Sequence, residues 1–154
     1  MEPLFILIIT FILTLVIVRG IKKRWMYSFA GRLAMSVMLL FTGVGHFMYP
    51  DGMALMLPEF IPFKKELIYL TGVIEIAAAA GLLIARLKRL TAWLLIIFFI
   101  VILPANINAA IHHVNLKTTA FDGKGPGYLW FRVPLQILFI AWVYYAGIKK
   151  TNTG

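Results

Sequence analysis

The chain alternates between long apolar runs and short connections that carry charges, prolines or glycines. The apolar runs cover residues 3–18, 30–49, 67–85, 90–111 and 126–148. About 20 apolar residues in a helix span the hydrocarbon core of a bilayer, so each run predicts a membrane-spanning helix. The pattern therefore predicts an all-α integral membrane protein, a helical bundle with five spans. Between the second and third runs, residues 52–60 form an amphipathic stretch that we expect to lie on the membrane surface as a lid.

The first run is the shortest and resembles a signal peptide in length. Its positive cluster, from Arg19 to Arg24, follows the apolar run instead of preceding it, and no small-residue cleavage site stands before the cluster. We therefore expect a retained helix. At this length it should be a short span at the edge of the bundle.

Composition supports lipid as the solvent and excludes several function classes. The chain is 62% hydrophobic and 14% charged, against about 25% charged in soluble domains. The net charge of +9 comes from short clusters between the runs, which favours topology signals over nucleic-acid binding. There is no cysteine, which excludes disulfides, thiolate metal sites and a thiol relay within the chain. Dinucleotide, P-loop and serine-nucleophile motifs are also missing.

The charges predict an orientation. One set of connections carries nine basic residues and no acidic residue: Arg19, Lys22, Lys23, Arg24, Arg86, Lys88, Arg89, Lys149 and Lys150. The other connections mix both signs. Because cytoplasmic loops are enriched in Lys and Arg, the N-terminus is expected outside and the C-terminus in the cytoplasm. The expected location is a bacterial inner membrane.

Polar side chains inside the predicted spans are the candidate site. They are His46, Glu75, Asn106, Arg132 and Gln136. With a rise of about 1.5 Å per residue, all of them are expected roughly 5–15 Å below the outer boundary. Polar groups at such depth are costly and usually face the bundle interior, where they mark function.

Two interpretations of this polar layer stay open. In the first it is a structural clamp, in which Glu75 and Arg132 are in contact, directly or through one water, Asn106 or Gln136, and offset each other's charge. Pro104 and Pro134 would free backbone carbonyls nearby, which polar side chains could then bind. In the second, the layer is a pocket open to the outer leaflet that binds the head group of a quinone-like or lipid-like ligand.

A metal site is not expected, because the adjacent His112 and His113 fall at a helix exit and point in different directions. No residue is assigned a catalytic role.

Four stretches resemble the DoxX-like family of small membrane proteins. They are Gly43-Val44-Gly45-His46-Phe47 with Pro50, Thr71-Gly72-Val73-Ile74-Glu75, Pro104-Ala105-Asn106-Ile107, and Trp130-Phe131-Arg132-Val133-Pro134-Leu135-Gln136 with Trp142. The resemblance covers about residues 31–147. It implies a four-helix membrane domain in residues 30–150, preceded in residues 1–29 by an extra N-terminal transmembrane helix and its basic loop.

Relatives in that family look like quinone-linked subunits of thiosulfate oxidation, redox-associated membrane components or receptor-assembly factors. Our leading hypothesis is a non-catalytic subunit or assembly factor that binds a quinone-like or lipid-like ligand. One alternative is the membrane subunit of a quinone-linked oxidoreductase, with Glu75 and His46 handling protons and Arg132 orienting an oxygen. Another is a small proton-coupled transporter. Quinone is the cofactor considered. Expected partners are membrane lipid and a membrane protein or second copy, not nucleic acid.

Overall fold

The fold is built of helices joined by short connections. The structure is a computed structural model that describes residues 2–149, so residue 1 and residues 150–154, including Lys150 of the C-terminal basic cluster, lie outside it. Its helices are α1 (Glu2–Lys22), α2 (Tyr27–Met48), α3 (Pro50–Ala54), α4 (Lys64–Leu83), α5 (Lys88–Ile111), η1 (Pro126–Tyr128), α6 (Leu129–Val143) and η2 (Tyr144–Ile148). The described residues contain no strand beyond one isolated bridge between Asn115 and Ala120. The predicted all-α class is confirmed.

Within residues 2–149, five segments are long and apolar enough to cross a membrane, as the hydrophobic pattern predicts. They are Glu2–Lys22, Tyr27–Met48, Lys64–Leu83, Lys88–Ile111 and Pro126–Ile148. The expectation of a short first span is wrong, because α1 has 21 residues. The helix does not end at the last apolar residue but continues through Arg19 and Lys22, whose long side chains can reach water from a helix end.

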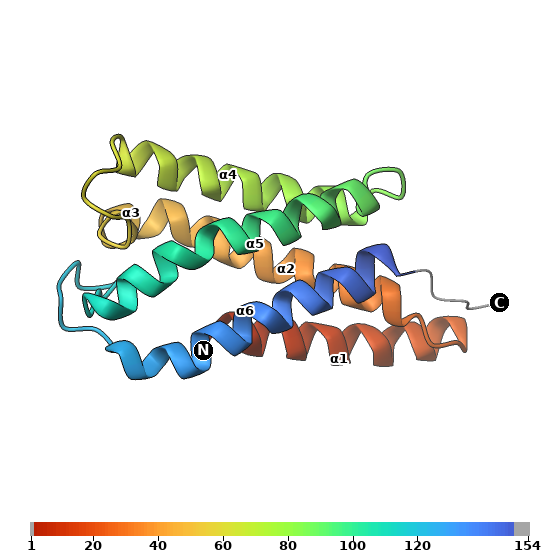
Figure 1. Ribbon diagram of the computed structural model, residues 1–154. Coiled ribbons are helices and arrows are strands. Elements are labelled where there is room, and N and C mark those ends of the chain that lie inside the picture. The colour runs from red at the N-terminus through yellow and green to blue at the C-terminus, as the bar shows by residue number, and fades with distance from the viewer. Residues whose placement is uncertain (1, 150–154) are drawn as a thin grey trace.

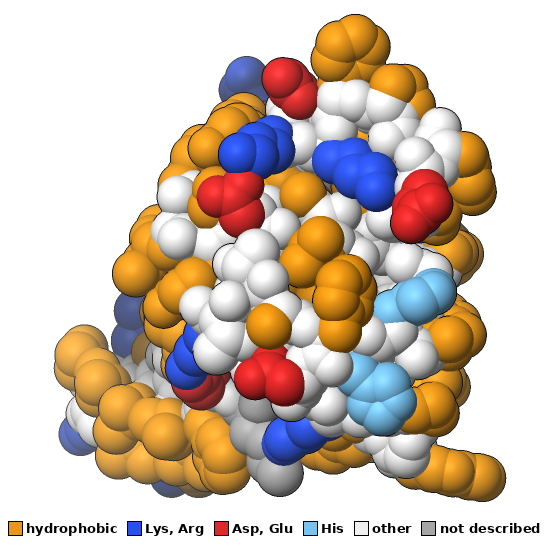
Figure 2. All heavy atoms as spheres, turned by 90° about the vertical axis from the view of Figure 1, so that its left-hand side faces the viewer, with side chains coloured by type: hydrophobic (Ala, Val, Ile, Leu, Met, Phe, Trp, Pro, Cys, Tyr) orange, Lys and Arg blue, Asp and Glu red, His pale blue; other side chains and the backbone are white. Residues whose placement is uncertain are grey.

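Consecutive long helices run antiparallel, so their connections gather at two ends of the bundle (Figure 1). The basic end holds the turns at 23–26 and 84–87 together with Lys149. The loop end holds α3 and the connections at 55–63 and 112–125. Figure 2 looks onto the loop end and shows acidic, basic and histidine side chains on its surface.

Acidic residues gather at the loop end. Asp51, Glu59, Glu66 and Asp122 lie in its short helix, its connections or the first turn of α4. Glu2 is held there by an ion pair of 3.2 Å to Lys117. Of the six acidic residues in the chain, this leaves Glu75 alone between the two ends and none at the basic end.

Helix α2 lies at the centre of the bundle. It packs along α1 and α4 and also contacts α6 and η2, while α5 packs between α4 and α6. The fully buried large side chains are aliphatic or methionine: Leu7, Met35, Met38, Leu39, Leu82, Leu95 and Val143. The outer circumference is apolar as well, and Ile12, Val101 and Ile137 are each more than half exposed. Such a surface is suited to contact with the hydrocarbon of a bilayer, where each helix forms its backbone hydrogen bonds internally.

Small residues allow α2 and α4 to approach closely. A Cβ added at Gly72 would lie 2.8 Å from the Cβ of His46 and 3.0 Å from the ring of Phe47. A Cβ added at Gly43 would lie 2.9 Å from Ile76. Helices in lipid associate by close packing of this kind, since hydrophobic burial gives little drive there. The crossing fixes the register of the two helices that carry His46 and Glu75.

Candidate functional site

Glu75 lies in the middle of α4 and is buried against α2, with 5% of its surface exposed. Thr42 donates a hydrogen bond from Oγ1 to Glu75 Oε2 over 2.6 Å. The close helix crossing at Gly43 and Gly72 puts this short hydroxyl side chain within reach of the carboxyl group. The carboxyl group is therefore held inside the bundle by a neutral hydroxyl and not by an arginine.

His46 follows Thr42 by one helical turn and borders the same cluster. Its Nδ1 lies 3.0 Å from the carbonyl oxygen of Thr42 and 3.8 Å from Oε2 of Glu75. Because a carbonyl oxygen can only accept, Nδ1 carries the hydrogen. Nε2 is then an acceptor in the neutral ring and a donor once the ring is protonated. His46 can thus present a hydrogen-bonding atom to a ligand, with Glu75 behind it.

Gln136 links α6 to α5. Its Nε2 donates to the carbonyl oxygen of Phe99 over 2.6 Å, and both side chains are buried. Pro104 of α5 has no N–H to donate to the carbonyl of Ile100, the residue next to Phe99. Gln136 therefore binds the carbonyl next to the one that Pro104 frees, and the expectation that polar side chains bind the freed carbonyls stays a prediction. It also sets the register of α5 against α6.

Arg132 lies on the face of α6 that is turned toward the bundle. It precedes Gln136 by four residues, and Gln136, Phe139 and Val143 are all buried at helical spacing. The central carbon of its guanidinium is 5.7 Å from the centre of the Tyr128 ring. Within residues 2–149, no carboxylate is in ion-pair contact with Arg132 and no hydrogen bond from its side chain forms.

Asn106 occupies the matching face of α5. It follows the buried Phe99 by two turns and precedes the buried Ala110 by one. Its amide forms no side-chain hydrogen bond to the described part of the chain. From the register that Gln136 sets, Asn106 lies within about 5 Å of the level of Arg132 along the bundle.

The expected ion pair between Glu75 and Arg132 does not form, and this prediction is wrong for a direct contact. Helices α4 and α6 both pack against α2 and α5 but do not pack closely against each other, so the two groups are on helices that do not adjoin. They also differ in depth. Gly81 of α4 faces Thr91 of α5; combined with the Gln136 contact, this places Glu75 about 9 Å deeper than Arg132, whereas counting through the Gly31 and Gly72 contacts of α2 places it about 3 Å deeper.

His46 is the residue of α2 at the level of Arg132. Gly31 of α2 packs on Ala146 after α6, where an added Cβ would lie 2.9 Å from the alanine methyl group. Counting from that contact puts His46 within about 2 Å of the level of Arg132. His46, Asn106 and Arg132, from three helices, are called the loop-end site below. Of the five predicted layer residues, Glu75 and Gln136 lie deeper.

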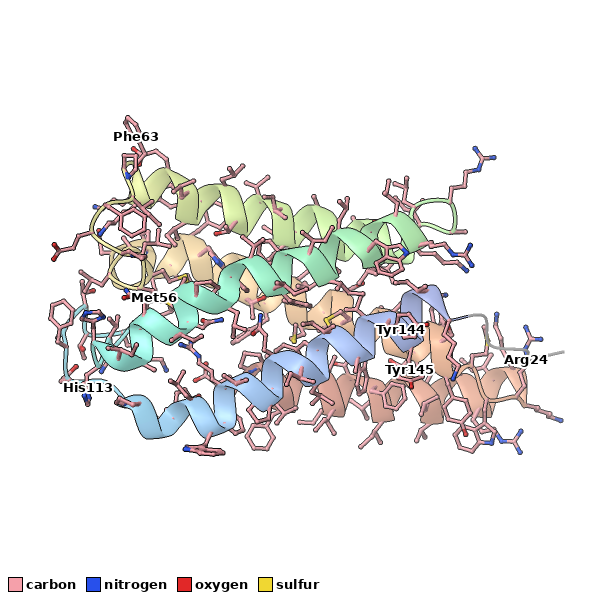
Figure 3. The ribbon with its side chains drawn as sticks, in the orientation of Figure 1. Arg24, Met56, Phe63, His113, Tyr144 and Tyr145 are labelled. Carbon is pink, nitrogen blue, oxygen red and sulfur yellow. The ribbon has the colours of Figure 1, made fainter. Side chains whose placement is uncertain are left out.

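A cap of loops closes the bundle above the loop-end site. The side-chain amide of Asn108 donates to the carbonyl oxygen of Met56 over 2.9 Å, and Met56 is buried. A Cβ added at Gly52 would meet the backbone of Leu116, so α3 and the 112–125 connection are in contact. Figure 3 shows Met56 and His113 at this end. The stretch 52–60 thus contacts α5 and the 112–125 connection, and its role as a lid stays a prediction.

The other histidines belong to the 112–125 connection. Nδ1 of His112 is 2.9 Å from the carbonyl of Asn108, and His113 has a positive φ of 53°. Within residues 2–149, no three His, Asp or Glu side chains gather closely enough to hold a metal ion.

Two residues of the site's surroundings were not predicted. Thr42 precedes His46 by four residues, and Tyr128 precedes Arg132 by four, so each shares a helix face with a predicted residue. That spacing is the signal that would have found them. On the opposite side of α6, an apolar groove begins at the same level, lined by Leu4, Trp130, Phe131, Pro134, Leu135 and Leu138.

The fold defines a class: a small helical bundle with polar groups inside, an apolar circumference and five candidate membrane spans. Residues 35–146 match the family described as "Domain of unknown function (DUF8561)", and the chain belongs to that family. The match begins inside α2 and includes all five predicted site residues, while α1 lies outside it. No curated protein and no solved structure matches the chain.

Proposed function

We propose that the chain is an integral membrane protein that acts as a non-catalytic subunit or assembly factor. Its loop-end site would bind the polar head of a quinone-like or lipid-like ligand. The DoxX-like motifs support a core of α2, α4, α5 and α6 to which α1 is added. The observation that carries the proposal is Arg132, which faces the bundle without a carboxylate partner in the described chain.

An arginine inside a membrane-spanning bundle is costly and is expected to have a partner or a function. On insertion scales such a residue costs about 2.5–3.5 kcal/mol at mid-bilayer, and such residues normally pair with an opposite charge or line a polar cavity. The ring of Tyr128 offers Arg132 a cation–π contact, which is worth about 0.5–2 kcal/mol. The guanidinium keeps its N–H donors available. An oxygen-rich head group supplies the acceptors that the protein does not.

The three side chains of the site suit an oxygen-bearing ring or a phosphate. Arg132 donates two parallel hydrogen bonds to a carbonyl or an anionic oxygen. The amide of Asn106 can donate and accept, and Nε2 of His46 can accept from a hydroxyl group. Glu75 lies deeper than these three residues and would act on the ligand through His46, whose Nδ1 is 3.8 Å from Glu75 Oε2.

The charge distribution supports an orientation for this site. The basic end would face the cytoplasm, with the N-terminus and the loop end outside, in a bacterial inner membrane. The loop-end site would then lie in the outer half of the bilayer, beneath the cap formed by α3 and the 112–125 connection.

Arg132→Gln should reduce the amount of ligand that co-purifies with the protein by about tenfold or more, since hydrogen bonds to a charged group contribute about 1.5–3 kcal/mol. The full chain is extracted in mild detergent, and bound small molecules are identified and counted by mass spectrometry. A quinone would favour the oxidoreductase-subunit alternative, and a phospholipid would favour lipid binding.

Lys124→Gln is the matched control, because Lys124 also lies over the ring of Tyr128, at 4.8 Å, but is exposed in the loop. The control should keep the ligand. If Arg132→Gln and Lys124→Gln lost the same amount of ligand, or if both retained it, the proposal would be contradicted.

A further inference from the structure

The basic end carries a concentrated positive surface. Residues 19–25, at the end of α1 and in the turn after it, are all exposed and include Arg19, Lys22, Lys23 and Arg24. Within residues 2–149 no acidic side chain lies at this end of the bundle, so the described part of the chain supplies no carboxylate to these cations. These cations are therefore available to anions from outside the described residues.

Aromatic rings lie beneath these cations. The guanidinium of Arg19 donates to the carbonyl of Lys23 and sits 5.5 Å from the ring of Trp25. Trp25 stacks on Tyr27, with ring centres 5.9 Å apart. At the end of the last span, Nζ of Lys149 lies 4.7 Å from the ring of Tyr145. Each of these rings is roughly half exposed.

Hydrogen bonds hold the start of α2, which follows Trp25, against the end of the last span, which carries Tyr145 and Lys149. Ser28, at the start of α2, donates to the carbonyl of Ala146 over 2.7 Å, and Arg32 donates to the same oxygen over 3.1 Å. That oxygen belongs to η2, a π-helical turn, which closes with a bond of 3.0 Å from Lys149 N to Tyr144 O. Figure 3 shows Arg24, Tyr144 and Tyr145 at this one end of the molecule.

We infer that this surface, called the basic–aromatic surface, is a binding site for the phosphodiester head group of an anionic membrane phospholipid. Its members are Arg19, Lys23, Arg24, Trp25, Tyr27, Tyr145 and Lys149. Lys and Arg donate to phosphate oxygens, and Trp and Tyr prefer the level of lipid head groups. Basic pockets between membrane helices on the cytoplasmic side are suited to such lipids.

The turn between α4 and α5 lacks the same construction. Arg86 in this turn and Lys88 and Arg89 in the first turn of α5 lie at the same end, but in the described chain no aromatic ring lies under any of them. This turn therefore offers positive charge without aromatic rings beneath it. The two turns therefore allow a specific head-group site to be told apart from general attraction of anionic lipid.

The test counts phosphatidylglycerol and phosphatidylcholine bound to the full chain by native mass spectrometry from mixed lipid–detergent micelles. The wild-type protein should retain phosphatidylglycerol preferentially. Arg19→Gln, Lys23→Gln and Arg24→Gln combined should reduce that preference by at least about tenfold, because hydrogen bonds to a charged group contribute about 1.5–3 kcal/mol. Micelles expose both ends of the protein, so a change in membrane orientation would not affect the count.

Arg86→Gln, Lys88→Gln and Arg89→Gln combined form the matched control, which removes the same charge and should keep the preference within about twofold of wild type. The double variant Trp25→Leu, Tyr145→Leu removes two of the aromatic rings and leaves every charge in place. It should weaken the preference for phosphatidylglycerol. Circular dichroism confirms that each variant is folded. Equal losses from both charge variants would show non-specific attraction and overturn the inference, as would retention by all variants. The site lies at the opposite end from the loop-end site, so its failure would leave the proposed function intact.

Discussion

Thr42→Val should destabilise the protein by about 1–3 kcal/mol, the cost of leaving a buried polar group without its hydrogen bond. The substitution keeps the shape of the side chain and removes only the hydroxyl that donates to Glu75. Glu75 is 5% exposed, so water cannot readily replace the lost donor. The measurement is the free energy of unfolding in detergent for Thr42→Val, Glu75→Gln and the double variant. The unfolding free energy that the double variant loses should be smaller than the sum of the two single losses.

Thr71→Val is the control for this cycle, because the hydroxyl of Thr71 donates only to the carbonyl of Ile68 in its own helix. Thr71→Val should lower the free energy of unfolding only slightly. A parallel cycle with Glu75→Gln and Arg132→Gln should be additive, since these two groups do not contact each other. Strong coupling in the Arg132 cycle, or none in the Thr42 cycle, would refute the described arrangement of the buried carboxyl group.

Gly72→Val should cost about 3 kcal/mol, at the upper end of the range for overpacking. Even the first atom of the new side chain would meet the Cβ of His46 at 2.8 Å and the backbone oxygen of Gly43 at 3.1 Å. Neither atom is the tip of a flexible side chain, so α2 and α4 would have to separate. The measurement is the melting temperature in detergent together with the unfolding free energy.

The control is Gly20→Val in α1, where nothing lies within 4 Å of an added Cβ. Its stability should stay close to wild type. If the two valine variants lost equal stability, the cost would come from the general behaviour of glycine in helices and not from a close helix crossing.

Sequence alone predicted the helices well because lipid leaves few alternatives. A spanning segment must satisfy its backbone internally, so each long apolar run reads as a helix. The ends are harder to predict. Helix α1 extends through Arg19 and Lys22, since a helix can continue past the last apolar residue wherever long side chains reach water.

Sequence predicted the depth of the polar residues only coarsely, and it could not predict which helices adjoin. Counting along the third apolar run placed Glu75 about 3 Å deeper than Arg132, and the helix contacts place it about 3–9 Å deeper, depending on the helices through which the count runs. The small residues at Gly43 and Gly72 decide that α4 lies against α2, and this brings Glu75 to Thr42. Hydropathy carries no information about such neighbours, so pairing Glu75 with Arg132 by charge alone gave the wrong partner.

The central claim is that the loop-end site receives a ligand's polar head, and a high-resolution structure of the protein in native lipid tests it most directly. The account predicts non-protein density within hydrogen-bond distance of the Arg132 guanidinium and the Asn106 amide. A dry, closely packed site in which protein groups satisfy Arg132 and Asn106 would contradict it and leave these residues with a structural role alone.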